Sequence, residues 1–214
     1  NNTAHNNTAI GYNASNLNTT GTKNVSCGED ALYTNTSGSE NSAFGYRALR
    51  LNTTASNNSA FGYDALKANT TGASNSAVGF KALNANTTGI NNNAFGRSAL
   101  ELNTTGGQNS AVGYYALYAT TEGDHNTGIG YAAGYGVTTG ANNLFLGRDA
   151  GRANSPSGNQ TTGSNTICLG NNSITAIYCT AGTINTSDER DKADIENFIA
   201  GLDFVNKMRP VTYR

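Results

Sequence analysis

The chain has 214 residues, a formal net charge of −1 and only 13% charged residues. This composition excludes the basic face that nucleic-acid binding needs, and it excludes the charged tail of many disordered proteins. No apolar run approaches the ~18–20 residues of a membrane span, so we expect no membrane insertion. The chain begins without Met and shows no signal peptide, and we therefore expect a fragment or a processed chain.

The few cysteines and histidines form no pattern of a metal site or a disulfide framework. There is no C-x-x-C pair, and the number of cysteines is odd; the residues are Cys27, Cys168, Cys179, His5 and His125. We therefore expect no metal and no cofactor. Cys27 is predicted to be a small core residue. Cys168 and Cys179 are predicted to be free and buried, with a bond or a reactive thiol near the end of the solenoid as the alternative.

From the N-terminus onwards the sequence repeats with a period of 17 residues. A glycine recurs at this spacing at Gly11, Gly28, Gly45, Gly62, Gly79, Gly96, Gly113, Gly130 and Gly147. The next glycine, Gly170, follows after 23 residues, so six residues are inserted in the last repeat. Repeats of this regularity indicate a stack of equivalent units.

Further columns keep the same period. In one representative repeat the fixed residues are Asn41, Phe44, Gly45, Ala48 and Leu49, and an Asn-Thr-Thr sequence follows. A unit of 17 residues is too short for a helical-hairpin repeat or a propeller blade, and it suits one coil of a β-solenoid. We predict one strand in "NSAFGY" and a second in the Asn-Thr-Thr region. Ten such coils would span roughly 50 Å, with asparagines hydrogen-bonded along the stack.

A coil this small has a thin interior, which the Ala and Gly columns are expected to line. The Phe/Val/Ile column and the Leu column then need a second place to be buried. A monomer would expose a long apolar stripe, and such a stripe marks an interface. The repeats alone therefore predict an assembly of several chains.

Receptor contacts, if the repeats make any, should lie in the columns that vary between coils. The columns two and five residues after the glycine alternate in charge sign, which favours a solubilising surface. The exceptions are four tyrosines in two adjacent coils, Tyr115, Tyr118, Tyr131 and Tyr135. Tyr118 and Tyr135 share a column, so we predict a stacked aromatic platform that could bind a sugar.

The composition changes near residue 186. We divide the chain into a repeat region (1–170), a β connector (171–186) and a charged C-terminal segment (187–214). Apolar residues recur at helical spacing between Ile195 and Met208, and residues 186–189 fit a helix-capping box.

The same C-terminal segment, "TSDERDK" followed by "GLDFVNKMRPVTYR", resembles the start of the endosialidase-type intramolecular chaperone of phage tail spikes and fibres. That family trimerises, folds the preceding β-fibre and cuts itself off. The resemblance implies Ser187 as nucleophile, Lys192 as general base and cleavage between Thr186 and Ser187. The family domain is longer than the segment present here, so this chaperone domain is incomplete.

The repeat itself is similar to the head repeats of YadA-like trimeric adhesins, which form a β-roll from shorter coils. Both resemblances imply an all-β solenoid or β-roll assembled as a parallel homotrimer, with a short C-terminal segment of mixed helix and strand. They also imply a function in attachment, either as a phage tail fibre of the virion or as a bacterial adhesin at the cell surface. The expected partners are a cell-surface glycan or protein receptor and other fibre or tail proteins.

Two other functions need features that the repeats lack. A glycan-degrading spike needs a pair of carboxylates, and no such pair recurs. An ice-binding solenoid needs a flat Thr-x-Thr plane, whereas the threonines here are adjacent and face opposite sides. We expect no enzymatic activity on external substrates.

Overall fold

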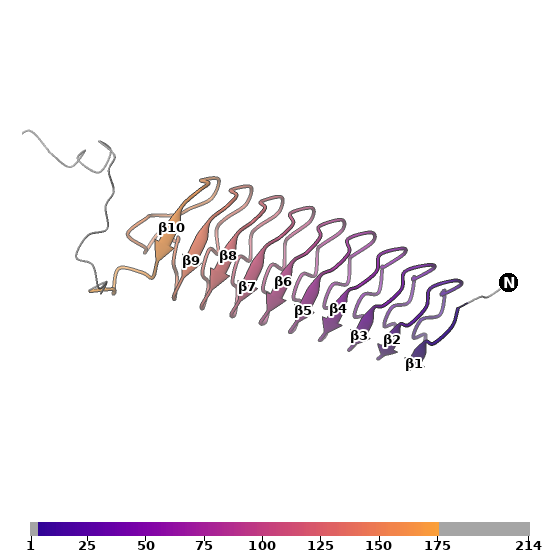
Figure 1. Cartoon of the computed structure of the whole chain (residues 1–214). Coiled ribbons are helices and arrows are strands. Elements are labelled where there is room, and N and C mark those ends of the chain that lie inside the picture. Colours follow the sequence, from indigo (N-terminus) through magenta and orange to yellow (C-terminus); the bar gives the residue numbers. More distant parts are fainter. Residues whose placement is uncertain (1–3, 176–214) are drawn as a thin grey trace, which may run out of the picture. The chain divides into compact units, whose positions relative to one another are not determined.

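Ten short parallel strands form a single sheet, one strand from each coil (Figure 1). The computed structural model describes residues 4–175, and within them it contains no helix. The strands are β1 (Thr8–Ile10), β2 (Val25–Cys27), β3 (Ser42–Phe44), β4 (Ser59–Phe61), β5 (Ser76–Val78), β6 (Asn93–Phe95), β7 (Ser110–Val112), β8 (Thr127–Ile129), β9 (Leu144–Leu146) and β10 (Ile167–Leu169). The predicted all-β solenoid with a 17-residue repeat is confirmed.

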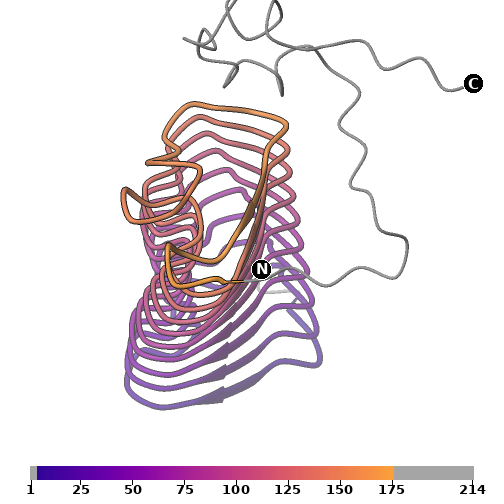
Figure 2. The same ribbon diagram turned by 90° about the vertical axis from the view of Figure 1, so that its left-hand side faces the viewer.

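The strands pair in chain order and in strict register. Phe44 of β3 faces Phe61 of β4, which faces Val78 of β5, so that equivalent residues form straight columns. The register survives the six-residue insertion, because Leu146 of β9 still pairs with Leu169 of β10. Each coil is therefore the template on which the next one stacks (Figure 2).

The interior of the coil is filled by alanine and leucine. From β2 to β10 the middle residue of each strand is buried, as Ala43 is, while its two neighbours are more exposed. Leu49 and its equivalents in six coils are fully buried inside the coil: Leu32, Leu49, Leu66, Leu83, Leu100 and Leu117. The expectation that the Leu column needs burial outside the coil was wrong, because a left-handed turn directs this side chain inward.

That turn uses an uncommon backbone conformation. Leu49 has a φ of 52°, and every equivalent leucine has a similar value. A left-handed conformation costs a non-glycine residue roughly 1–2 kcal/mol. Full burial of a leucine stabilises by about 1.5–3 kcal/mol and offsets this cost.

The Asn-Thr-Thr region does not form the predicted second strand. It bends instead, and the first threonine binds the next coil through both its backbone and its side chain. Thr53 donates its N–H to the carbonyl of Thr70 at 3.1 Å and its Oγ1 to the same oxygen at 3.1 Å. The segment thus gains a ladder of hydrogen bonds between coils without the extended geometry of a strand.

Two columns of buried asparagines hold each coil to the next. In the column four residues before the glycine, Asn58 accepts the N–H of Asn75 at 2.9 Å and donates its Nδ2 to the carbonyl of Gly72 at 2.9 Å. In the column seven residues after the glycine, Asn69 donates to Asn52 Oδ1 and also to the carbonyl of Gly72, both at 2.9 Å. The predicted asparagine ladder is therefore present twice, and both ladders meet at the same turn carbonyl.

Near the C-terminal end of the repeats the core changes composition without changing the coil. Phe145 of β9 occupies the inward column, which holds alanine from β3 to β7, and it is fully buried. Gly134 and Gly151 stand where other coils have leucine, and a Cβ on Gly134 would lie 2.7 Å from the Phe145 ring. One phenylalanine thus replaces the leucines of two coils.

Beyond β10, residues 171–175 form a turn. The remainder of the predicted connector, 176–186, and the predicted segment 187–214 lie outside the described residues.

Candidate functional site

The outward residues of the strands form an exposed apolar stripe along the sheet. We call the column directly before the glycine the outer apolar column; it comprises Ile10, Cys27, Phe44, Phe61, Val78, Phe95, Val112, Ile129, Leu146 and Leu169. Eight of these side chains are between 37 and 60% exposed. Phe44 and Phe61 stack with ring centroids 4.9 Å apart. The predicted apolar stripe is present on the single chain.

The cysteines do not all lie in the core. Cys27 belongs to the outer apolar column and is half-buried, so its prediction as a core residue was wrong. Cys168 lies in the inward column of β10 and is a buried free thiol, as predicted. Cys179 is outside the described residues.

A second column, directly after the glycine, forms a stack of rings and guanidinium groups. Tyr46, Tyr63 and Phe80 stack with centroids 5.0 and 5.2 Å apart. Arg97 continues the stack, with its Cζ 5.2 Å from the Phe80 ring and 5.6 Å from the Tyr114 ring. Because a guanidinium stacks well on an aromatic face, it replaces a ring in this column without interrupting it.

In the N-terminal coils, the variable columns carry paired charges. Arg47 lies 3.0 Å from Asp64, and Lys67 lies 3.6 Å from the same carboxylate. Arg50 pairs with Asp30 at 3.2 Å. Asp64 is buried, whereas its two cationic partners remain partly exposed to solvent, so these pairs neutralise the buried carboxylate and keep charge on the surface.

Three coils after Asp64, tyrosines replace the paired charges. Tyr118 and Tyr135 stack at 5.0 Å with an interplanar angle of 9°. Tyr115 meets their edges at 5.0 and 5.8 Å, and it also contacts Tyr114 at 4.0 Å. Tyr114 in turn stacks on Tyr131 at 5.5 Å. The structure brings together all four tyrosines that the sequence singled out, and it adds Tyr114; we call these five residues the tyrosine cluster.

The stacking limits how this cluster can bind a ligand. Tyr118 and Tyr135 turn their faces toward each other, and Arg152 covers Tyr135 with its Cζ 4.9 Å from the ring centroid. Ring edges and phenol groups are left for contact, rather than a broad open face. A sugar lying flat on a ring therefore fits this geometry less well than a ligand held by hydrogen bonds.

The surroundings of two tyrosines in the cluster favour the neutral phenol. Burial raises the pKa of Tyr118, and the nearby Glu101 and Tyr135 raise it further. A hydrogen bond with Tyr115 raises the pKa of Tyr114, with a smaller contribution from desolvation. Neutral phenols both donate and accept hydrogen bonds, so the cluster can bind either kind of polar group.

The cluster is flanked by positive charge. Asp149 binds Arg152 at 2.7 Å and Arg148 at 3.2 Å. Desolvation opposes ionisation of Asp149, but hydrogen bonds from Arg152 and Asn154 and the two positive charges hold its pKa below the usual value. Within residues 4–175, Arg97 has no carboxylate partner.

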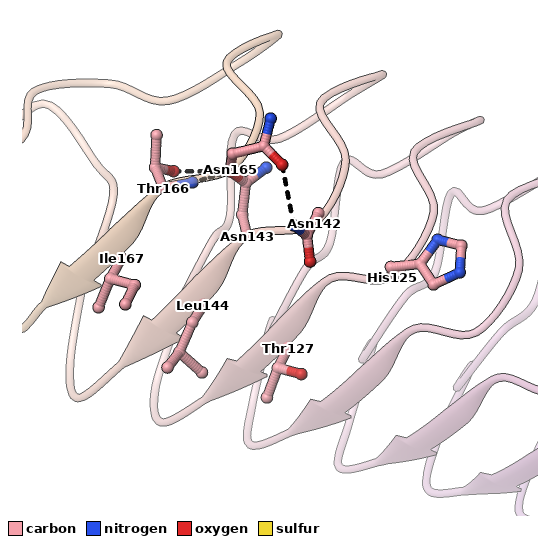
Figure 3. Close-up of a pocket in the computed structure, with 8 residues that line it drawn as sticks. All are labelled: His125, Thr127, Asn142, Asn143, Leu144, Asn165, Thr166 and Ile167. Carbon is pink, nitrogen blue, oxygen red and sulfur yellow. Dashed lines mark hydrogen bonds between the residues drawn. The ribbon is translucent and has the colours of Figure 1, made fainter.

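A shallow groove of about 400 Å³ lies at the C-terminal end of the sheet (Figure 3). His125, Asn142 and Asn165 line one side, and Asn142 Nδ2 donates to Asn165 Oδ1 at 2.8 Å. Thr127, Leu144 and Ile167 line the other side. This groove was not predicted from the sequence. The sequence feature that could have indicated it is the change from Ser110 and Thr127 to Leu144 and Ile167 in one column.

The predicted cleavage site, with Ser187, Lys192 and the Thr186–Ser187 bond, lies outside the described residues. Among residues 4–175, no group of three or more His, Cys, Asp or Glu side chains could hold a metal ion. The same part of the chain contains no helix of the length and apolarity that crossing a membrane requires.

Comparison of the chain with protein-family models, with curated proteins and with solved structures gives no match.

Proposed function

We propose that the chain is the shaft or head of a homotrimeric attachment fibre, from a phage tail or a bacterial surface. The outer apolar column carries this proposal. It runs without interruption along ten strands, and large side chains such as Phe61 and Phe95 are 40 and 43% exposed in the single chain. A monomer in water would leave this stripe uncovered, whereas three parallel copies sharing it would bury every row at once.

The mass in solution tests this proposal. We expect sedimentation equilibrium to give three times the chain mass of 22.1 kDa. Replacing Phe44, Phe61 and Phe95 together by serine should give monomers, because the three side chains are the largest in the seam and all point outward. A matched control replaces the outward residues Thr54, Thr71 and Thr105 by serine and should remain trimeric. A wild-type monomer would contradict the proposal.

The resemblance at the C-terminus extends the proposal to maturation. Ser187, next to Lys192 as general base, would cut the chain before itself once the fibre has folded. The intact protein with its complete C-terminal region is needed for this test. Mass spectrometry should locate a cut between Thr186 and Ser187 in the wild type and none in Ser187→Ala. If the wild type is not cut, the helix-capping box is the interpretation of residues 186–189 that remains.

A further inference from the structure

The tyrosine cluster is the place where two stacked columns of the solenoid become connected. Tyr115 lies between the column of Tyr114 and Tyr131 and the column of Tyr118 and Tyr135, with ring contacts to both. In other coils the equivalent of Tyr115 is a residue such as Arg47, Asp64 or Lys81. Only here do the described coils present a continuous surface of five tyrosines.

Ring contacts hold this surface in place before any ligand arrives. Each tyrosine of the cluster touches at least one other ring, and the coils beneath it are fixed by the backbone ladder, as in the bond from Leu117 N–H to the carbonyl of Ala133 at 2.9 Å. Tyrosine loses little conformational entropy on binding, because it has only two side-chain torsions. A pre-ordered cluster loses still less.

The charge around the cluster favours an anionic ligand. Arg97 stacks on Tyr114, Arg148 lies over Tyr131 and Arg152 lies over Tyr135. Asp149 is shared by Arg148 and Arg152, and Glu101, which lies near Tyr118, pairs with Lys81 at 3.7 Å, so Arg97 keeps its charge uncompensated by either carboxylate. The whole chain has a net charge of −1, which makes this local excess of positive charge a distinct feature.

We infer that the tyrosine cluster and Arg97 bind an acidic glycan, in which sugar hydroxyls contact the phenols and a carboxylate binds the Arg97 guanidinium. A guanidinium offers a planar fork of donors that matches a carboxylate, and Arg97 is exposed and free of a carboxylate partner within residues 4–175. The phenols supply many hydrogen bonds and little flat apolar area, which suits a polyhydroxylated chain better than the apolar anchor of a protein partner. This inference rests on the proposed attachment function and names the receptor class.

Binding of defined oligosaccharides to the full chain tests the inference. The probe is a hexamer of galacturonic acid, with neutral maltohexaose as its uncharged counterpart, both measured by calorimetry. We expect the acidic hexamer to bind and maltohexaose to bind at least about tenfold more weakly, because the neutral chain lacks the carboxylate that makes the charge-assisted contact with Arg97. Equal binding of the two, or no binding of the acidic hexamer, would overturn the inference.

Variants then locate the site. Arg97→Gln and the double variant Tyr115→Ala/Tyr118→Ala should each weaken binding of the acidic hexamer about tenfold or more. The matched control is Arg50→Gln, which removes the same charge in the N-terminal coils, where Arg50 pairs with Asp30, and it should bind like the wild type. If Arg97→Gln binds as tightly as Arg50→Gln, the site is not the one inferred.

The mass in solution, measured on the same samples, separates the two proposals. If the protein is a trimer but does not bind the acidic hexamer, the glycan site is overturned and the proposal of a trimeric fibre stands. A monomer that binds the hexamer through Arg97 supports the glycan site and contradicts the trimeric fibre.

Discussion

The coils around Asp64 and those around Tyr118 share one backbone and carry different surfaces. Both regions have the buried asparagine column before the glycine and the buried alanine column three residues after it, and both repeat the same backbone hydrogen bonds between coils. On the outside, the first region carries the pairs of Asp64 with Arg47 and Lys67, and the second carries stacked tyrosines. The columns that hold the stack together are therefore separate from the columns in which the proposed glycan site lies.

Replacing a residue of the glycine column by alanine should lower the free energy of unfolding most, and by the same amount in the two regions. A Cβ on Gly62 would meet the Gly79 carbonyl carbon at 2.7 Å, and one on Gly113 would meet that of Gly130 at 2.8 Å. Both glycines also have a φ near +140°, which strains any other residue. We expect Gly62→Ala and Gly113→Ala each to lower the free energy of unfolding by about 4 kcal/mol in urea titrations. A loss below about 1 kcal/mol in either would contradict this view of the stack.

The next effect concerns the asparagine ladder. Asn58→Ala removes the acceptor for the Asn75 N–H and one of the two amide donors to the Gly72 carbonyl, which keeps its bond from Asn69. Asn109→Ala removes the acceptor for the Asn126 N–H and the amide donor to the Gly123 carbonyl, in a coil where Thr120 stands in place of the second asparagine. We expect Asn58→Ala to lose about 1–2 kcal/mol of unfolding free energy and Asn109→Ala about 2–3 kcal/mol. Equal losses would show that the second asparagine column does not support the turn carbonyl.

One substitution, Thr120→Asn, should extend the second asparagine column into the tyrosine region. The second asparagine column ends at Asn103, and Asn103 Oδ1 and Thr120 Oγ1 are buried without hydrogen-bond partners. In Thr120→Asn the new amide can donate to Asn103 Oδ1, as Asn103 itself donates to Asn86 Oδ1 at 2.7 Å. We expect the free energy of unfolding, measured by thermal or urea denaturation, to rise by about 1 kcal/mol. Thr104→Asn, in the column that is already bonded through Oγ1, serves as the control and should give no gain.

Surface substitutions should change stability least and separate the regions most clearly. Asp64→Asn weakens the contacts of this buried carboxylate with Arg47 and Lys67, and we expect a loss of about 1 kcal/mol of unfolding free energy, because both cations are partly exposed and the asparagine keeps an acceptor oxygen. Tyr118→Ala should be similarly mild in unfolding experiments while it weakens binding of the acidic hexamer. An Asp64→Asn variant that weakened glycan binding as much would remove the distinction between the two surfaces.

Much of this architecture was predictable from the sequence, because a strict period forces equivalent residues into columns. The glycine spacing, the asparagine ladder and the stacking of Tyr118 on Tyr135 all followed from it. The second strand and the burial of Leu49 were predicted wrongly, since a left-handed leucine at φ 52° has no signal in a pattern of apolar residues. The role of Tyr115 as a bridge between columns was also invisible, because it depends on which way that turn directs the ring.

The most direct test of the fibre is cross-linking through Cys27. In a parallel, in-register trimer that shares the outer apolar column, the three Cys27 thiols lie at one height around the axis. A variant with Cys168→Ser and Cys179→Ser should therefore give three-chain products with a tris-maleimide reagent. Replacing Cys27 by serine and adding Ser37→Cys moves the thiol to an exposed column of the threonine bend, and the product should disappear. Cross-linking through position 37 but not through Cys27 would contradict the account and place the contact between chains on another face.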